Sequence, residues 1–473
     1  MTDVDAVVVG SGPNGLVAAV VLAEAGWKVL VLEAAERPGG GLRTEELTLP
    51  GFKHDLGSTV HALGLGSEAF RSLDLSREGL EFAHPPTPLG HAITPGTSVL
   101  LHRSVEQTSA GLGRDGARWQ RVVGGFGRRW EGLVSSVLNP TAFPPKAPRE
   151  LLEFGMHGLW PATASIRTGF REEPARALFA GLAAHSALDL REPLTSGIAL
   201  FLGGLGHGVG WPVAVGGSQS IADALIARVE SLGGEVRTGY RVSSLSELPS
   251  ARAVLLDLTP YQVLAVAGDR LPDRYAARLA RWRYGPAVFK IDWAIDGPVP
   301  WADPALAGAG TVHIGGTAAT VIASERAVSH GTVTGEPFIL LVQATVADPT
   351  RAPAGKHTVW AYCHVPHSSR VDATEAIESR IERFAPGFRD RVLGRHVMSP
   401  AALESWNENL VGGDIAGGVT DWRQLIARPA PSPSPWATPV PGLFLCSSST
   451  LPGGGVHGMG GWNAARTVLA RRG

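Results

Sequence analysis

The sequence predicts an α/β fold, in which a parallel sheet flanked by helices is interrupted by an inserted α+β domain with a mixed or antiparallel sheet. Three observations predict this architecture. A β-branched run leads into a glycine-rich loop near the start of the chain. Further glycine clusters occur near the middle and near the end. Between the clusters lie amphipathic helical stretches and strand-like runs separated by Pro/Gly turns.

The N-terminal segment has the pattern of a βαβ unit. Residues 5–9, DAVVV, predict a buried strand, residues 14–25 predict a helix that stops at Gly26, and residues 28–33, KVLVLE, predict a second strand. The intervening glycines permit a tight turn, and they let the backbone approach a pyrophosphate at the helix N-terminus. The unit therefore predicts a Rossmann-like dinucleotide site formed by Gly10, Ser11, Gly12, Pro13, Asn14 and Gly15.

Glu33 narrows the choice of dinucleotide. It closes the second predicted strand. Its spacing from Gly15 along the sequence is typical of the carboxylate that binds an adenosine ribose. A carboxylate at this position disfavours NADP, because its charge would meet that of a 2′-phosphate. FAD and NAD both remain compatible with the unit.

A second glycine cluster, AAERPGGGLRT at residues 34–44, follows directly, and HDLGS at residues 54–58 comes next. Here the chain resembles the glutathione-reductase-like flavoproteins, specifically the family of phytoene desaturases, carotenoid isomerases and flavin amine oxidases. In that family a GG-x-x-x-S/T segment wraps the FAD pyrophosphate, and a D-x-G-x segment lies near the flavin. Gly41 stands where the family usually has arginine, and Arg43 follows two residues later. The resemblance implies FAD contacts from Gly40, Gly41, Leu42, Arg43, Gly57 and Ser58.

Two later segments extend the resemblance and favour FAD over NAD. Residues 216–242 predict a helix and a short strand, and Val242 matches the position whose backbone touches adenine in such flavoproteins. Residues 441–470 resemble the family's last FAD element, in which a helix aims its N-terminus at the flavin. The implied contacts there are Val456, Gly458 and Met459. Nothing resembles a cysteine attachment of the flavin, so we expect FAD to be bound non-covalently.

The glycine-rich stretch at residues 203–217 raises the alternative of a second, nicotinamide-binding loop. The preceding IALFL could be a strand, but Trp-Pro-Val after Gly210 cannot open a helix as a phosphate loop requires. We therefore interpret the stretch as a turn-rich wall beside the flavin. Without a nicotinamide site, the electron acceptor would be dioxygen, a quinone or the substrate itself.

The order of these motifs predicts two domains, each formed from separate parts of the chain. The FAD domain is expected to comprise residues 1–90, 213–268 and 398–473. A substrate domain, inserted twice, is expected to comprise residues 91–212 and 269–397.

Composition excludes several other classes of protein. The 42 basic and 43 acidic residues nearly cancel, which argues against nucleic-acid binding. No apolar run is long enough for a transmembrane helix, although peripheral membrane contact stays open. Two cysteines and a polar N-terminus indicate a cytoplasmic protein. No group of histidines and acids has metal-ligand spacing, so no metal is predicted.

The resemblance implies an FAD-dependent dehydrogenase or desaturase that removes hydride from a carbon of a small, largely apolar substrate, acting on a CH–CH group. Two histidines are candidate catalytic residues: His457, inside the C-terminal motif, and His61, just after HDLGS. Three alternatives remain: an amine oxidase acting on a C–N bond, with Trp462 and Tyr362 as walls of an amine cage, a redox-neutral flavin-dependent isomerase, and a flavin-stabilised binding protein without turnover.

Overall fold

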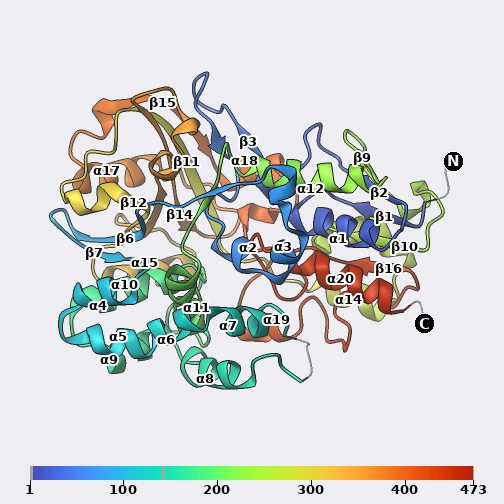
Figure 1. The fold of residues 1–473 in the computed structure, drawn as a ribbon, viewed down its shortest axis with the longest axis horizontal. Coiled ribbons are helices and arrows are strands. Elements are labelled where there is room, and N and C mark those ends of the chain that lie inside the picture. Colours follow the sequence, from blue (N-terminus) through green and yellow to red (C-terminus); the bar gives the residue numbers. More distant parts are fainter. Residues whose placement is uncertain (1–3, 141–143, 472–473) are drawn as a thin grey trace.

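The computed structural model describes residues 4–140 and 144–471, which form two large sheets surrounded by helices (Figure 1). The first sheet is parallel and has the strand order β16-β10-β1-β2-β9. Its strands are β1 (Ala6–Val9), β2 (Val29–Leu32), β9 (Glu235–Arg237), β10 (Ala253–Leu256) and β16 (Leu443–Leu445). The N-terminal, middle and C-terminal motifs thus meet in one sheet, and the predicted α/β class is confirmed.

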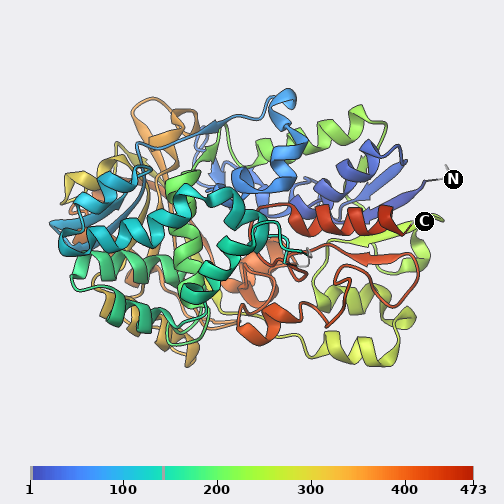
Figure 2. The same cartoon turned by 60° about the horizontal axis from the view of Figure 1, so that its bottom comes forward.

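Helices cover both faces of this sheet. Successive side chains of a strand point to opposite faces, and in β1 and β2 all of them are apolar and buried. Ala6 and Val8 of β1 pack into one core, and Val7 and Val9 pack into another on the opposite face. The first core is closed by α1 (Pro13–Glu24), α12 (Gln219–Ser231) and α20 (Met459–Ala470). The second is closed by α13 (Pro260–Ala267) and α14 (Asp273–Ala280). Figure 2 shows α20, from the end of the chain, crossing the sheet beside the N-terminal segment.

The second sheet is mixed and has the order β15-β11-β14-β13-β12-β6-β7. All neighbours are antiparallel except β12 and β6. One face packs against α17 (Thr374–Phe384), and α10 (Glu173–Ala184) contacts strands at the other end of the sheet (Figure 1). The strands are β6 (Thr87–Thr94), β7 (Thr97–Leu101), β11 (Ala287–Asp296), β12 (Ala309–Ile314), β13 (Ile339–Val342), β14 (Lys356–Val365) and β15 (Val392–Met398).

Further helices and four short strands complete the described part of the chain. The remaining α-helices are α2 (Ala62–Gly66), α3 (Glu68–Leu73), α4 (Val105–Ala110), α5 (Gly116–Arg121), α6 (Val123–Arg128), α7 (Trp130–Val137), α8 (Pro148–Gly158), α9 (Ala162–Gly169), α11 (Thr195–Gly208), α15 (Ala318–Ser329), α16 (Ala344–Ala347), α18 (Pro400–Trp406) and α19 (Trp422–Ile426). The two-residue strands are β3 (Thr44–Glu45), β4 (His54–Asp55), β5 (Phe82–Ala83) and β8 (Val213–Ala214).

The turn-rich wall expected at residues 203–217 is wrong for its first part, because α11 extends to Gly208. The preceding IALFL, which could have been a strand, belongs to the same helix. Its glycines allow other elements to approach the helix closely. A Cβ at Gly206 would lie 2.6 Å from the side chain of Leu101, and one at Gly208 would lie 2.4 Å from the ring of Trp130. The glycine excess here therefore reports close helix packing, not a phosphate loop.

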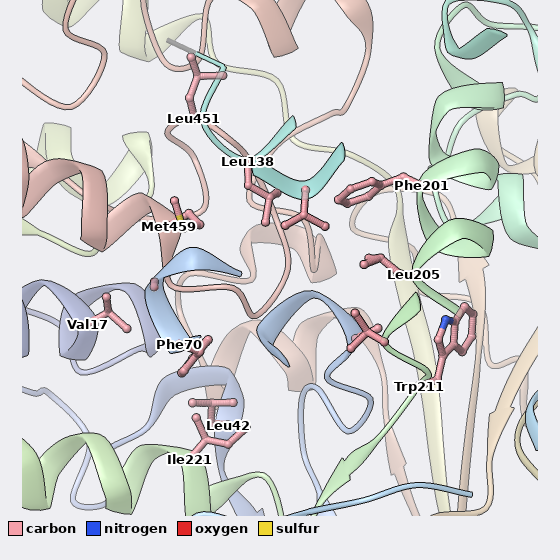
Figure 3. Close-up of a cluster of buried hydrophobic side chains, with 14 of the residues drawn as sticks. Val17, Leu42, Phe70, Leu138, Phe201, Leu205, Trp211, Ile221, Leu451 and Met459 are labelled. Carbon is pink, nitrogen blue, oxygen red and sulfur yellow. The ribbon is translucent and has the colours of Figure 1, made fainter. Parts of the chain in front are cut away.

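One hydrophobic core extends from α1 and α20 to α11, where it includes Leu205 (Figure 3). It joins the helices on the first sheet to the helical layer below the second. The five-part domain division stays a prediction. In the part of the chain that the structure describes, no helix has both the length and the hydropathy needed to cross a membrane.

Candidate functional site

A cavity of about 1390 Å³ lies between the two sheets. At one end it is lined by the loop after β1, by Glu33 at the end of β2 and by Asp257 at the end of β10. At the other end it is lined by side chains of β11, β13 and β14 on one side and of α11 on the other. Carboxyl ends of parallel strands are where nucleotides bind in such sheets.

The loop that opens α1 has the geometry of a phosphate site. Gly10 has φ +99°, which only glycine adopts readily, and Gly12 caps a twelve-residue helix without a side-chain bond. A Cβ at Gly40 would lie 2.9 Å from the Gly12 Cα, so two glycine segments meet here. Glu33 accepts hydrogen bonds from Ser11 N (2.8 Å), from Ser11 Oγ (2.6 Å) and from a backbone amide two residues later.

A positive charge stands at the same wall. The Arg43 guanidinium is buried over the ring of Trp406, 4.6 Å from its centroid, and Nη2 donates to the Trp406 carbonyl at 2.7 Å. Its Nε has no hydrogen-bond partner within residues 4–140 and 144–471. A buried cation with an unused donor beside a helix N-terminus fits the anionic pyrophosphate of a dinucleotide.

Asp257 lies directly beneath the loop. Its Oδ2 accepts from the Gly15 amide at 2.9 Å, and a Cβ at Gly12 would lie 2.6 Å from the same oxygen. Burial, with a smaller contribution from the charge of Glu33, raises the pKa of the Asp257 carboxyl to about 7. The carboxyl is therefore largely protonated below neutral pH, and it then adds no negative charge behind the loop.

This shift predicts a pH dependence of stability. The pKa in the folded chain lies above its ordinary value of 3.8, so the folded state holds the proton more tightly. The contribution of this carboxyl to the free energy of unfolding is complete below about pH 4 and is lost as the pH rises through about 7. Its upper limit is about 4 kcal/mol. Asp257→Asn should remove it. The midpoint of thermal unfolding of both proteins, measured between pH 4 and 8, tests this. The same change of midpoint with pH in both proteins would contradict it.

The cavity brings together most of the residues predicted from the sequence to hold the cofactor. Those that line it are Gly10, Ser11, Gly12, Pro13, Asn14, Glu33, Gly40, Gly41, Arg43, Gly57, Ser58, Val242 and Val456. The others lie just behind this surface: Gly15, Leu42, Gly458 and Met459. Gly15 has a packing reason for being glycine, because a Cβ there would lie 2.2 Å from the Gly10 carbonyl.

The two candidate catalytic histidines have different surroundings. His457 lines the cavity, but both ring nitrogens are bonded to backbone: Nε2 to the Gly453 carbonyl at 3.2 Å and Nδ1 to the Met459 amide at 3.1 Å. His61 lies outside the lining and bonds Ser218 Oγ through Nε2 at 2.8 Å. Burial lowers the pKa of each to about 4. Both rings are therefore neutral at neutral pH, and their catalytic role stays a prediction.

On the second sheet, sequence reasoning named Tyr362 as a candidate wall of an amine cage but did not place Trp360 or His364 beside it. Trp360, Tyr362 and His364 alternate along β14 and line the cavity, while the residues between them, such as Cys363, pack into the core on the other face. This period of two was visible in KHTVWAYCHV and could have placed the three residues on one face.

Lys290 on β11 also lines the cavity and was missed. Its ammonium donates to Asp292 Oδ1 at 2.6 Å and lies 5.3 Å from the centroid of the Trp360 ring. His54 Nδ1 lies 3.6 Å from the same carboxylate oxygen. The pair is buried on both sides, so the cation is held in place at the wall. Lys290 and Asp292 are two residues apart on β11, but no local sequence pattern joins them to Trp360 or His54.

Trp462, expected as one wall of an amine cage, does not line the cavity, whereas Tyr362 does. The Tyr362 ring is stacked beside that of Trp360, with centroids 5.8 Å apart. β14 therefore contributes a stacked aromatic pair to the cavity, and Phe201 of α11 and Trp211 add further aromatic surface.

Comparisons with known proteins agree with this geometry. A family model described as an NAD(P)-binding Rossmann-like domain matches residues 8–74. Pyridine nucleotide-disulfide oxidoreductase domain-containing protein 2 of Rattus norvegicus is 28% identical, over 98% of this chain and 93% of the relative. A neurosporene-forming phytoene desaturase of Cereibacter sphaeroides is 24% identical, over 98% and 94%.

A solved structure of putrescine oxidase with bound putrescine has the same fold. It aligns with a TM-score of 0.63 at 17% identity and covers 99% of each chain. The chain is therefore similar over nearly its whole length to a phytoene desaturase and an oxidoreductase domain-containing protein, and its first part matches a Rossmann-like dinucleotide-binding domain.

Proposed function

We propose that the protein is an FAD-dependent dehydrogenase that takes hydride from a carbon of a largely apolar substrate and leaves a new double bond. One observation carries the proposal: a single cavity runs from the dinucleotide loop to a chamber between the second sheet and α11. The chamber walls include Ile198, Phe201, Leu340 and Val342, so most of the surface that meets a substrate is apolar. The similarity to a phytoene desaturase supports the same reaction class.

In this proposal the cofactor lies along the first part of the cavity. The residues that would hold it are Gly10, Ser11, Gly12, Pro13, Asn14, Gly15, Glu33, Gly40, Gly41, Leu42, Arg43, Gly57, Ser58, Val242, Val456, Gly458 and Met459. When bound, FAD supplies the hydride acceptor. The chain binds the pyrophosphate at the α1 N-terminus and Arg43, binds the ribose at Glu33, and excludes water with the apolar chamber.

Non-covalent attachment is supported by the cysteines. Cys363 faces the core behind β14, and Cys446 is buried just after β16. Burial raises the pKa of the Cys446 thiol well above its ordinary value and that of Cys363 to about 12. Neither thiol is poised to attack a flavin. We propose dioxygen or a quinone as the electron acceptor. The glycine-rich stretch that was the alternative nicotinamide-binding loop begins within the helix α11 and so is not a loop there.

Anaerobic reduction of the bound flavin tests the reaction class. The purified yellow protein should be bleached by phytoene dispersed in detergent and should not be bleached by putrescine or benzylamine. Detergent without phytoene is the control. Bleaching by the amines alone would replace this proposal with C–N oxidation. Absence of bleaching by any of them would favour a flavin-stabilised binding protein or a redox-neutral isomerase.

Amine oxidation is the second candidate. The stacked pair Trp360 and Tyr362 favours it, because aromatic faces attract cationic amines. The Lys290 ammonium weakens this argument, because it already lies 5.3 Å from the centroid of the Trp360 ring.

A further inference from the structure

The chamber of the cavity is apolar along most of its walls but has a polar end. His364, near the end of β14, lines this end together with His185, which follows α10. The ring of Phe338 lies 6.5 Å from that of His364 and 5.2 Å from that of His313, which in turn lies 5.0 Å from that of His185. The two imidazoles therefore belong to one continuous aromatic layer.

A buried carboxyl fixes the orientation of His364. Glu325 on α15 lies behind the ring, outside the cavity lining, and its Oε2 is 2.8 Å from His364 Nδ1. Both side chains are buried. Because a carboxylate only accepts hydrogen bonds, Nδ1 carries the proton of this hydrogen bond, and Nε2 is the ring nitrogen left for a partner in the cavity.

The neighbouring imidazoles add no charge to this end. His185 Nε2 is 2.9 Å from His313 Nε2, so one of the two rings donates to the other. Burial lowers the pKa of His185 to about 3 and that of His313 well below its ordinary value. Trp211 packs edge-on against His185, with ring centroids 5.6 Å apart, and also lines the cavity. This end thus offers Nε2 of His364 as a hydrogen-bonding atom among aromatic walls.

A hydroxyl group fits this end of the chamber, because its O–H can donate to Nε2 of His364, which would otherwise be desolvated without a partner. Lys290 is the register partner of Tyr362, two residues before His364 on β14, and its ammonium is paired with Asp292, so it adds no net charge to this wall.

We propose that the substrate is an apolar molecule that carries a hydroxyl group, and that His364, held by Glu325, binds this hydroxyl at the polar end of the chamber. The inference rests on the proposed function, because it names the class of substrate that the same cavity takes. His364 determines specificity here, and Glu325 is a positioning residue.

Calorimetric titration with 1-octanol and with its methyl ether tests the proposal. Both probes have the same apolar chain and one oxygen atom, but only the alcohol can donate a hydrogen bond. The wild-type protein should bind the alcohol about tenfold more tightly than the ether. His364→Phe should abolish that preference, and Glu325→Gln, which keeps the shape of the side chain, should reduce it.

His357→Phe is the matched control, because His357 lies on the same strand, bonds Thr345 and does not line the cavity. It should keep the wild-type preference. Equal affinity of the wild type for alcohol and ether, tighter binding of octylamine than of octanol, or absence of binding would overturn the proposal. Flavin content is measured on the same sample, so a protein without FAD would refute the proposed function separately from the hydroxyl site.

Discussion

Gly461→Ala is expected to destabilise the folded protein by at least about 3 kcal/mol and to lower its flavin content. Gly461 lies in α20, and a Cβ there would lie 1.8 Å from the Asn14 carbonyl oxygen and 3.0 Å from the Ala18 nitrogen. Both atoms belong to the backbone of α1, so no side-chain rotation can relieve the contact. The two helices would have to separate at the turn that opens the dinucleotide site.

Gly155→Ala is the matched control for this substitution. Gly155 also lies within a helix, α8, and nothing lies within 4 Å of the position of its Cβ. Alanine there should raise stability by about 0.5–1 kcal/mol, as it does in unstrained helices. The midpoint of thermal unfolding and the flavin absorbance of each variant give both readouts. Equal stability of the two variants would show that α1 and α20 do not pack as described.

Arg351→Met should cost about 3–5 kcal/mol, because it leaves two buried carboxylates without their cation. The Arg351 guanidinium is fully buried, donates to Asp55 at 3.0 Å and to Asp348 at 3.1 Å, and reaches the Ala214 carbonyl. Asp55 also accepts from the Ser218 amide at 2.9 Å. The ion pairs join the HDLGS segment to a loop that precedes β14.

The exposed pair of Arg237 and Glu235 provides the comparison for the buried one. Arg237→Met should change stability by less than about 1 kcal/mol, since exposed pairs contribute little. Urea unfolding of the two variants distinguishes buried from exposed pairing. A small effect of Arg351→Met would mean that water reaches the two carboxylates in the folded protein.

The parts of the fold that sequence predicts well are those set by neighbours in the chain. The βαβ unit is one, because Gly10, Gly12 and the continuous apolar runs of β1 and β2 lie close together in the chain. The last helix is another, since a glycine run after a buried strand indicates where α20 begins.

The missed features depend on partners that are distant in the chain. Glu325 and His364 are joined only because α15 packs against β14, and Lys290 meets Trp360 only because β11 and β14 are neighbours in the sheet. The prediction of turns at residues 203–208 failed for a related reason. Glycine is needed there for close helix contacts that only the tertiary structure creates. Propensity alone treats those glycines as turns.

Release of the chromophore tests the central claim most directly. The purified protein is denatured with acid, the precipitate is removed, and the flavin in the supernatant is identified and counted. The account predicts about one FAD per chain in the supernatant and a colourless precipitate. A colourless protein that binds NADH, or a flavin that stays with the precipitated chain, would contradict it.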